Sequence, residues 1–149
     1  RIQFIYQSPK AFAPTNQRDW LDRIKSETGY AQVAGIELTL LDAIRYYQAC
    51  GGVNAAAQLV HDLGAQARLR KLADASKHYE DSSVRRLGYL LELYGHERQA
   101  ETLIGAALRA KSYKQLNPSE KPISEVLADP LEKNEKWKIL VNEFVEIDR

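Results

Sequence analysis

Two carboxylates in the sequence, Glu37 and Asp42, have the residue types needed for acid–base or metal-assisted chemistry. On a helical wheel Asp42 falls at the edge of an apolar face, where a carboxylate needs a hydrogen-bond or ion-pair partner. Arg45, three residues further on, is one candidate partner, and Arg86 is another. Glu37 lies five residues before Asp42, a spacing that does not bring two side chains to one helix face. We therefore favour a structural role for both carboxylates over a catalytic or metal-binding role.

The residues that most often bind metals or act as nucleophiles do not form a recognisable set. The three histidines, His61, His78 and His96, have no metal-type spacing to another histidine, cysteine or carboxylate. Cys50 is the sole cysteine, so the chain cannot form an intramolecular disulfide, and a reducing cytoplasm is its natural compartment. The Gly51-Gly52 pair lacks the lysine and the glycine spacing of phosphate-binding loops. The sequence therefore predicts a cytoplasmic protein that is not an enzyme and uses no metal or cofactor.

Six cations could form an electrostatic footprint for nucleic-acid phosphates or for another partner. They are expected on or just after two helices: Arg68, Arg70, Lys71, Arg109, Lys111 and Lys114. The net charge of +1 gives no strong signature, although cations outnumber acids before residue 119 and acids outnumber cations after it. From the residues alone we favour the alternative interpretation, a solvated helix face. No apolar run is long enough to cross a membrane, so no membrane partner is expected.

The middle of the chain has the periodicity of helices, because apolar residues recur there at intervals of three and four. We expect five helices, at residues 36–50, 55–63, 65–77, 85–94 and 97–110. Asn54 is the expected N-cap of the second helix, and Gly64 its left-handed stop. One of residues 81–83 is the expected N-cap of the fourth helix, which Gly95 should end.

Extended segments are expected on both sides of these helices. Alternating and β-rich patterns predict strands at residues 1–7, 30–34, 112–118 and 135–148. Residues 8–17 and 119–134 have the prolines of loops, and residues 18–29 are interpreted as one or two amphipathic helical turns. The sequence thus predicts a single α+β domain over residues 1–149, in which a helical middle is flanked by N- and C-terminal strands that could share one sheet.

The segment "RRLGYLLELYGH" at residues 85–96 contains residues that a helix does not favour. A mid-helix glycine such as Gly88 costs about 1 kcal/mol relative to alanine, which suggests a second helix packed too closely for a side chain. Arg85 and Arg86 are expected in the first turn, where the helix dipole disfavours cations. We therefore expect an acid such as Asp42 or Glu37 to hold at least one of them.

Four segments occur in an order that resembles the C-terminal region of the AbiEi-like antitoxins, the transcriptional regulators of type IV toxin–antitoxin systems. They are "TGYAQVAGIELTLLDAI", "GGVNAAAQLV", "RRLGYLLELYG" and "KWKILVNEFVEID", and they run from about Thr28 to Asp148. "ELTLLD" is similar to a family block that often has arginine where this chain has Leu38. "RLGYLLE" is the most specific piece, and Trp137 and Asn142 fit a closing Trp-x-x-x-x-Asn pattern.

This resemblance implies a function that the residues alone do not show. Members of the family carry an N-terminal winged helix-turn-helix that binds operator DNA and represses their own operon; we expect it in the full-length protein but not in this chain. The C-terminal domain supports toxin neutralisation and cooperative DNA binding. The family acts in abortive infection, a form of phage resistance, and its functional partner is a nucleotidyltransferase-like toxin, although the type IV label does not imply direct binding.

The resemblance also assigns structural roles to the residues of the family blocks, which are Glu37, Asp42, Arg86, Gly88, Trp137 and Asn142. Arg86 is expected to anchor its helix to the "ELTLLD" helix. Arg85, outside the block, is expected to face solvent, where it joins the six cations as a possible partner contact. Two other functions stay open: a metal-dependent phosphodiester-processing enzyme built on Glu37 and Asp42, and a protein-binding module with no nucleic-acid role.

Overall fold

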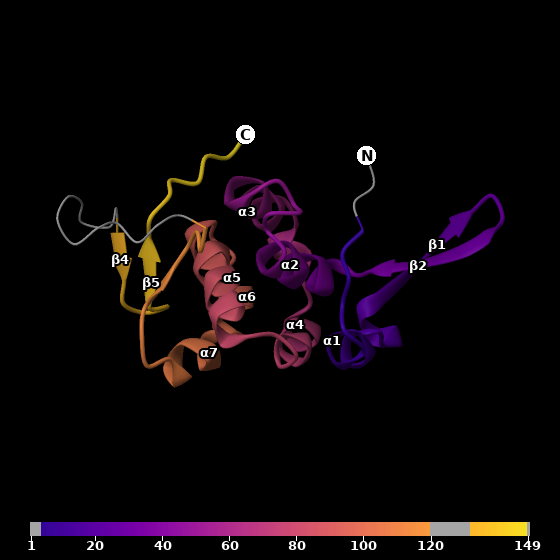
Figure 1. Ribbon diagram of the computed structural model, residues 1–149, viewed down its shortest axis with the longest axis horizontal. Coiled ribbons are helices and arrows are strands. Elements are labelled where there is room, and N and C mark those ends of the chain that lie inside the picture. The colour runs from indigo at the N-terminus through magenta and orange to yellow at the C-terminus, as the bar shows by residue number, and fades with distance from the viewer. Residues whose placement is uncertain (1–3, 120–131, 149) are drawn as a thin grey trace.

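A computed structural model describes residues 4–119 and 132–148 of the protein. Helices form the centre of the molecule, with a small sheet at each end (Figure 1). The predicted α+β class, with strands on both sides of a helical middle, is confirmed. The expectation that the terminal strands share a sheet is wrong, because the N-terminal and C-terminal strands belong to separate sheets.

The N-terminal part consists of helix α1 (Pro9–Thr15), a 3-10 turn η1 (Arg18–Trp20) and a hairpin of β1 (Leu21–Ser26) and β2 (Gly29–Ala34). The loop predicted for residues 8–17 is wrong, because Ser8 caps α1 and Pro9 occupies its first position, where proline is well tolerated. The helical turns predicted for residues 18–29 are mostly wrong, since β1 occupies residues 21–26. The strand at 30–34 is confirmed, whereas residues 4–7 of the strand predicted at 1–7 belong to no strand and residues 1–3 lie outside the described part.

The central helices are α2 (Ile36–Arg45), α3 (Val53–Leu63), α4 (Leu69–Ser76), α5 (Asp81–Leu93), α6 (Glu97–Glu101) and α7 (Ile104–Arg109), with a 3-10 turn η2 (Gly64–Gln66) after α3. Helices are therefore confirmed in all five predicted regions, but their ends differ. The first ends at Arg45 instead of residue 50, and the fifth is interrupted between α6 and α7.

Two residues that were predicted to cap or end helices, Asn54 and Gly64, have other roles. Asn54 lies inside α3, whose N-cap is Gly52 at φ 98°. Gly64 has φ −55° and is not left-handed; a Cβ there would overlap the His96 ring and lie 2.8 Å from Leu91 Cδ2, so close packing explains this glycine. Gly95 follows α5 at φ +81°, as predicted for a helix stop.

The C-terminal sheet contains β3 (Lys114–Gln115), β4 (Glu132–Asn134) and β5 (Ile139–Val141) in the order β3-β5-β4. β5 pairs parallel to β3 and antiparallel to β4. β3 and β5 lie within the predicted strands at 112–118 and 135–148 but are much shorter, and β4 was predicted as loop. The remainder of the predicted linker, residues 120–131, lies outside the described residues.

The hydrophobic core lies between the helices and the C-terminal sheet. Helix α5 contacts α2, α3, α6 and α7, and its Leu87, Leu90 and Leu91 are fully enclosed. Trp137 and Ile139 from the C-terminal segment complete the same core. In contrast, every residue of β2 is exposed, so the hairpin contributes almost nothing to the core. Among the residues that the structure describes, no helix is long and apolar enough to cross a membrane.

Candidate functional site

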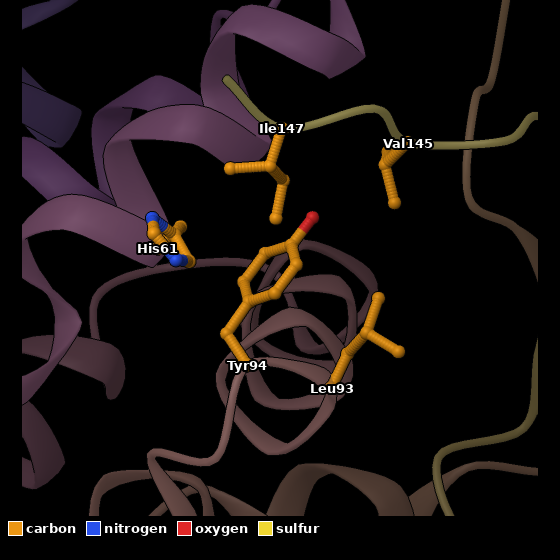
Figure 2. A pocket seen from close by; sticks show the side chains of 5 residues that line it. All are labelled: His61, Leu93, Tyr94, Val145 and Ile147. Atoms are coloured by element: carbon orange, nitrogen blue, oxygen red, sulfur yellow. The ribbon is translucent and has the colours of Figure 1, made fainter. Parts of the chain in front are cut away.

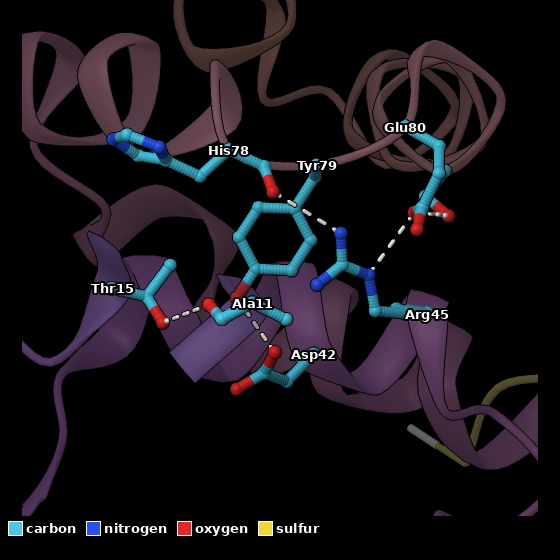
Figure 3. Close-up of polar contacts among 8 residues, drawn as sticks. Ala11, Thr15, Asp42, Arg45, His78, Tyr79 and Glu80 are labelled. Atoms are coloured by element: carbon cyan, nitrogen blue, oxygen red, sulfur yellow. Dashed lines mark hydrogen bonds and ion pairs between the residues drawn. The ribbon is translucent and has the colours of Figure 1, made fainter. Parts of the chain in front are cut away.

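The two candidate carboxylates do not converge. The Tyr79 hydroxyl donates a hydrogen bond to Asp42 Oδ1 at 2.6 Å (Figure 3), whereas Glu37 Oε1 accepts one from the backbone N–H of Arg68 at 2.8 Å. Burial raises the pKa of Asp42 against the opposing effects of the Tyr79 hydrogen bond and the Arg45 charge. Each carboxylate is therefore used to hold neighbouring segments together, and the geometry offers no paired acid and base.

Asp42 has a different hydrogen-bond partner from the two arginines that the sequence suggested. Arg45 Nε donates to Glu80 Oε2 at 3.0 Å, and its guanidinium stacks 4.1 Å from the centre of the Tyr79 ring. These contacts join α2 to the turn before α5 (Figure 3). Asp42, Arg45, Tyr79 and Glu80 form one polar latch between these elements.

Arg85 lies inside the protein, which contradicts the prediction that it faces solvent and is available to a partner. It is 3% exposed, and it donates to the backbone carbonyls of Trp137 at 3.1 Å, Ser112 at 3.1 Å and Lys138 at 2.8 Å. Because α5 begins at Asp81, Arg85 is in the second turn and not the first, and the C-terminal segment covers its side of the helix.

Arg86 also contacts backbone instead of the predicted acid. Its Nε donates to the carbonyl of Gln115 in β3 at 2.8 Å, and burial lowers the pKa of its guanidinium. The prediction that Arg86 anchors α5 to α2 is therefore wrong: both arginines attach α5 to the C-terminal segments. Backbone carbonyl groups near the C-terminal sheet accept the hydrogen bonds of both guanidinium groups, where the sequence predicted an acid.

Gly88 leaves room for an aromatic ring. A Cβ on Gly88 would lie 2.8 Å from Trp137 Cε3 and closer still to two other ring carbons. The neighbour is thus an indole and not the second helix that the sequence suggested. Trp137 is fully buried, and its Nε1 donates to Glu92 one turn further along α5. Burial disfavours ionisation of Glu92, but hydrogen bonds from Lys136 and Trp137 outweigh it and lower the pKa of Glu92.

Asn142 extends the pairing of the C-terminal sheet. Its Oδ1 accepts from the backbone N–H of Asn117, and its Nδ2 donates to the carbonyl of the same residue, both at 2.9 Å. A single side-chain amide thereby reproduces the two hydrogen bonds of a strand neighbour just beyond β3 and β5. This geometry gives Asn142 a local structural role.

The six candidate contact cations form two separate groups. Arg68, Arg70 and Lys71 lie at the beginning of α4, where the Arg70 side chain is 95% exposed and its Nε is 4.0 Å from Asp74 Oδ2. Arg109 lies at the end of α7 and makes a two-pronged contact with Asp81, at 2.8 and 3.1 Å. Lys111 and Lys114 are exposed on the segment after α7. The six candidate cations thus come from the start of α4, the end of α7 and the segment after α7.

A further group of polar side chains on the hairpin was missed by the sequence interpretation. β1 and β2 pair Arg23 with Gln32 and Lys25 with Tyr30, so all four share one face. The Arg23 guanidinium lies 4.0 Å from the centre of the Tyr30 ring. The available signal was the spacing of Arg23 and Lys25, because a strand places residues that are two apart on the same side.

A cavity of about 460 Å³ lies between α3, the end of α5 and the C-terminal segment, lined by His61, Leu93, Tyr94, Val145 and Ile147 (Figure 2). Within residues 4–119 and 132–148, the Tyr94 hydroxyl is the one buried side-chain polar atom without a hydrogen-bond partner. Burial raises the pKa of Tyr94 to about 12. His61 Nδ1 lies 2.9 Å from Asp62 Oδ1, and the residues that line this cavity include no serine, threonine or cysteine.

In the described part of the chain, no three histidine, cysteine or acidic side chains cluster as they would around a metal ion. A search of curated proteins and a search of solved structures gave no significant match. A family model described as the AbiEi antitoxin C-terminal domain matches residues 1–93. This match includes the segment before Thr28 and the blocks from Glu37 to Arg86, and it ends before Trp137 and Asn142. The protein therefore belongs to the AbiEi antitoxin C-terminal domain family.

Proposed function

We propose that this domain is the antitoxin and regulatory part of a type IV toxin–antitoxin pair, and that it supports toxin neutralisation and cooperative DNA binding without catalysis. Family membership over residues 1–93 is the observation that carries the proposal. In this proposal the protein acts in the cytoplasm. A winged helix-turn-helix in a longer form of the protein reads the operator, and a nucleotidyltransferase-like toxin is the functional partner.

The contacts of the candidate acids support a role without catalysis. Phosphodiester chemistry with a metal requires Glu37 and Asp42 to face one cleft. Instead Glu37 accepts from the Arg68 backbone, and Asp42 accepts from Tyr79 in the latch. The enzymatic alternative therefore has no geometric support in these residues.

The exposed cations at the start of α4 support a contact with DNA phosphates. Arg68 and Arg70 are exposed, and the closest acid to Arg70 is at the 4.0 Å limit of an ion pair. Such cations contribute roughly equal, salt-sensitive and sequence-indifferent affinity. Arg109 contributes less because Asp81 already neutralises it, while Lys111 and Lys114 extend the positive surface after α7.

Growth rescue tests the proposal directly. The 149-residue protein is co-expressed with the toxin encoded beside it, next to a variant with Arg68→Ala, Arg70→Ala and Lys71→Ala. The matched control removes three exposed cations elsewhere, with Lys10→Ala, Arg98→Ala and Lys133→Ala. Circular dichroism and thermal unfolding show that each variant is folded.

We expect the parent and the control to restore growth, and the α4 variant to fail while it remains folded. Failure of the folded parent would contradict the assignment of toxin neutralisation to this domain. Equal rescue by all three proteins would keep the antitoxin function but remove the α4 cations from it.

A further inference from the structure

The β1–β2 hairpin projects from the helical body, and within the described residues no third strand pairs with it (Figure 1). Only Leu21 of its twelve strand residues is partly covered. Its base is attached to the body, since the Gly35 N–H donates to the Trp20 carbonyl at 2.7 Å. An isolated two-stranded hairpin is only marginally stable in water. This hairpin therefore presents a large polar surface that the fold itself does not use.

The two faces of the hairpin have different chemistry. Residues paired directly across the strands project to the same side, so one face carries Arg23, Lys25, Tyr30 and Gln32. The opposite face carries Asp22, Ile24, Ala31 and Val33. The first face thus combines two cations, one aromatic ring and one amide. None of these four residues is acidic.

The cations of this face are available to a partner. Within the described residues, no carboxylate lies within 4.0 Å of the charged nitrogens of Arg23 or Lys25. Arg23 instead stacks on Tyr30, which is 61% exposed. Arg18 and Asp22 border the same concave surface as Arg23, Tyr30 and Gln32, so the hairpin base adds a third cation and one acid, and the surface stays net positive. A partner of this surface must be negatively charged and must offer planar or hydrogen-bonding groups.

The dimensions of the hairpin select among negatively charged partners. Six residues per strand span about 20 Å, and two paired strands lie about 5 Å apart. The major groove of B-form DNA is about 12 Å wide and admits a two-stranded ribbon. The major groove of A-form RNA is too narrow for side chains to read. Arginine and glutamine are also the side chains that form paired hydrogen bonds with purine edges.

We propose that the Arg23–Lys25–Tyr30–Gln32 face of the hairpin enters the major groove of double-stranded DNA. Arg23 and Lys25 contact phosphates or base edges, and Tyr30 and Gln32 face the groove floor. The inference rests on the proposed function, in which the domain binds DNA. In that function the α4 cations contact only the DNA phosphates, and the hairpin is added here as an element that enters a groove. The inference concerns residues to which the sequence interpretation gave no functional role, although the family match covers them.

The first experiment measures DNA affinity by fluorescence anisotropy, with the 149-residue protein and a labelled 20-bp duplex of mixed sequence between 50 and 200 mM KCl. The variant Arg23→Gln/Lys25→Gln is compared with Arg98→Gln/Lys133→Gln, which removes the same charge from exposed positions elsewhere. We expect the hairpin variant to lose about tenfold in affinity and about 2 in the slope of log K against log salt. The control should change neither value beyond error.

A second measurement separates groove entry from general attraction to polyanions. The same protein is titrated with an RNA duplex of the same sequence, and dimethyl sulfate probes guanine N7 in the DNA major groove. We expect weaker binding to the RNA duplex, and N7 protection that the hairpin variant loses. Equal binding to RNA, displacement by polyglutamate at equal charge, or no DNA binding by the parent would each overturn the proposal.

Growth rescue keeps this inference distinct from the proposed function. If the parent restores growth and Arg23→Gln/Lys25→Gln binds DNA as tightly as the parent, the hairpin proposal fails while the antitoxin function stands. If the parent binds DNA through the hairpin but does not restore growth, the hairpin proposal stands and the neutralisation role fails.

Discussion

Cationic side chains have opposite surroundings at the two ends of the molecule. Near the C-terminal sheet, Arg85 is enclosed by three backbone carbonyls and Arg86 donates to a fourth. On the hairpin, Arg23 and Lys25 project from strands that no other element covers. The residue type is nearly the same, so the packing of the element decides whether a cation stabilises the fold or is available to a partner.

The largest expected difference between these regions is in stability. Arg85→Gln leaves buried carbonyls without their charged donor, and we expect it to lower the free energy of unfolding by about 3 kcal/mol or more. Arg23→Gln removes an exposed charge and should change it by less than about 0.5 kcal/mol. Urea unfolding followed by tryptophan fluorescence, to which buried Trp137 and partly buried Trp20 contribute, measures both values. A similar loss of unfolding free energy in the two variants would contradict the difference proposed between the buried and the exposed cations.

Gly88→Ala tests the close packing at the buried end. The new Cβ would overlap the Trp137 ring, so we expect a loss of about 1–3 kcal/mol in the free energy of unfolding. Gly105→Ala in α7 is the matched control, because its Cβ would meet only the flexible end of Arg109 at 3.3 Å. The control should be neutral or more stable by up to about 1 kcal/mol, from helix propensity. A Gly88→Ala protein as stable as the control would show that the ring can move aside.

The smallest effect is expected from the latch between α2 and α5, and it depends on pH. Burial raises the folded-state pKa of Asp42 above 3.8, so the folded protein holds this proton more tightly than the unfolded chain does. The resulting stability is fully present below pH 3.8 and is lost as pH rises through the raised value. An asparagine in place of Asp42 would keep an acceptor for Tyr79 without a charge.

We therefore expect Asp42→Asn to gain stability relative to the parent as pH rises from 3.8 to 7, by up to about 1 kcal/mol. Asp62→Asn provides a control of opposite sign at lower pH. The hydrogen bond with His61 lowers the pKa of exposed Asp62, so the stability that Asp62 contributes is present above pH 3.8 and is lost as pH falls through the lowered value. Thermal unfolding from well below pH 3.8 up to neutral pH measures both trends. An Asp42→Asn effect that is constant with pH would mean that Asp42 is no more protonated in the folded protein than in the unfolded chain.

The central helices could be predicted from the sequence because a core imposes its periodicity on them. Gly95, for example, ends α5 in the left-handed conformation that its position predicts. The hairpin has no such core. Its strand "LDRIKS" alternates only weakly in polarity, since no face of β1 is buried, and the same letters also fit an amphipathic turn. A strand without a buried face leaves little hydrophobic pattern to detect.

The predicted contacts of the site residues were wrong where the true partner is distant in sequence. The need of Asp42 for a partner was predictable from its place beside apolar residues, but Tyr79 could not be identified from spacing. The assignments of Arg85 and Arg86 failed because the covering carbonyls come from residues 112–115 and 137–138. Contacts over such separations depend on the path of the whole chain, which local patterns do not encode.

The position of Trp137 has a consequence for synthesis of the protein. Its ring fills the space left by Gly88, and the following strand β5 lies between β3 and β4. This cover of α5 is therefore made by residues translated after the seven helices of the described part of the chain. Until residues 137–141 have left the ribosome, a nascent chain exposes the apolar side of α5 to chaperones and proteases. Chains whose translation stops before Trp137 therefore lack the side chain that covers Gly88.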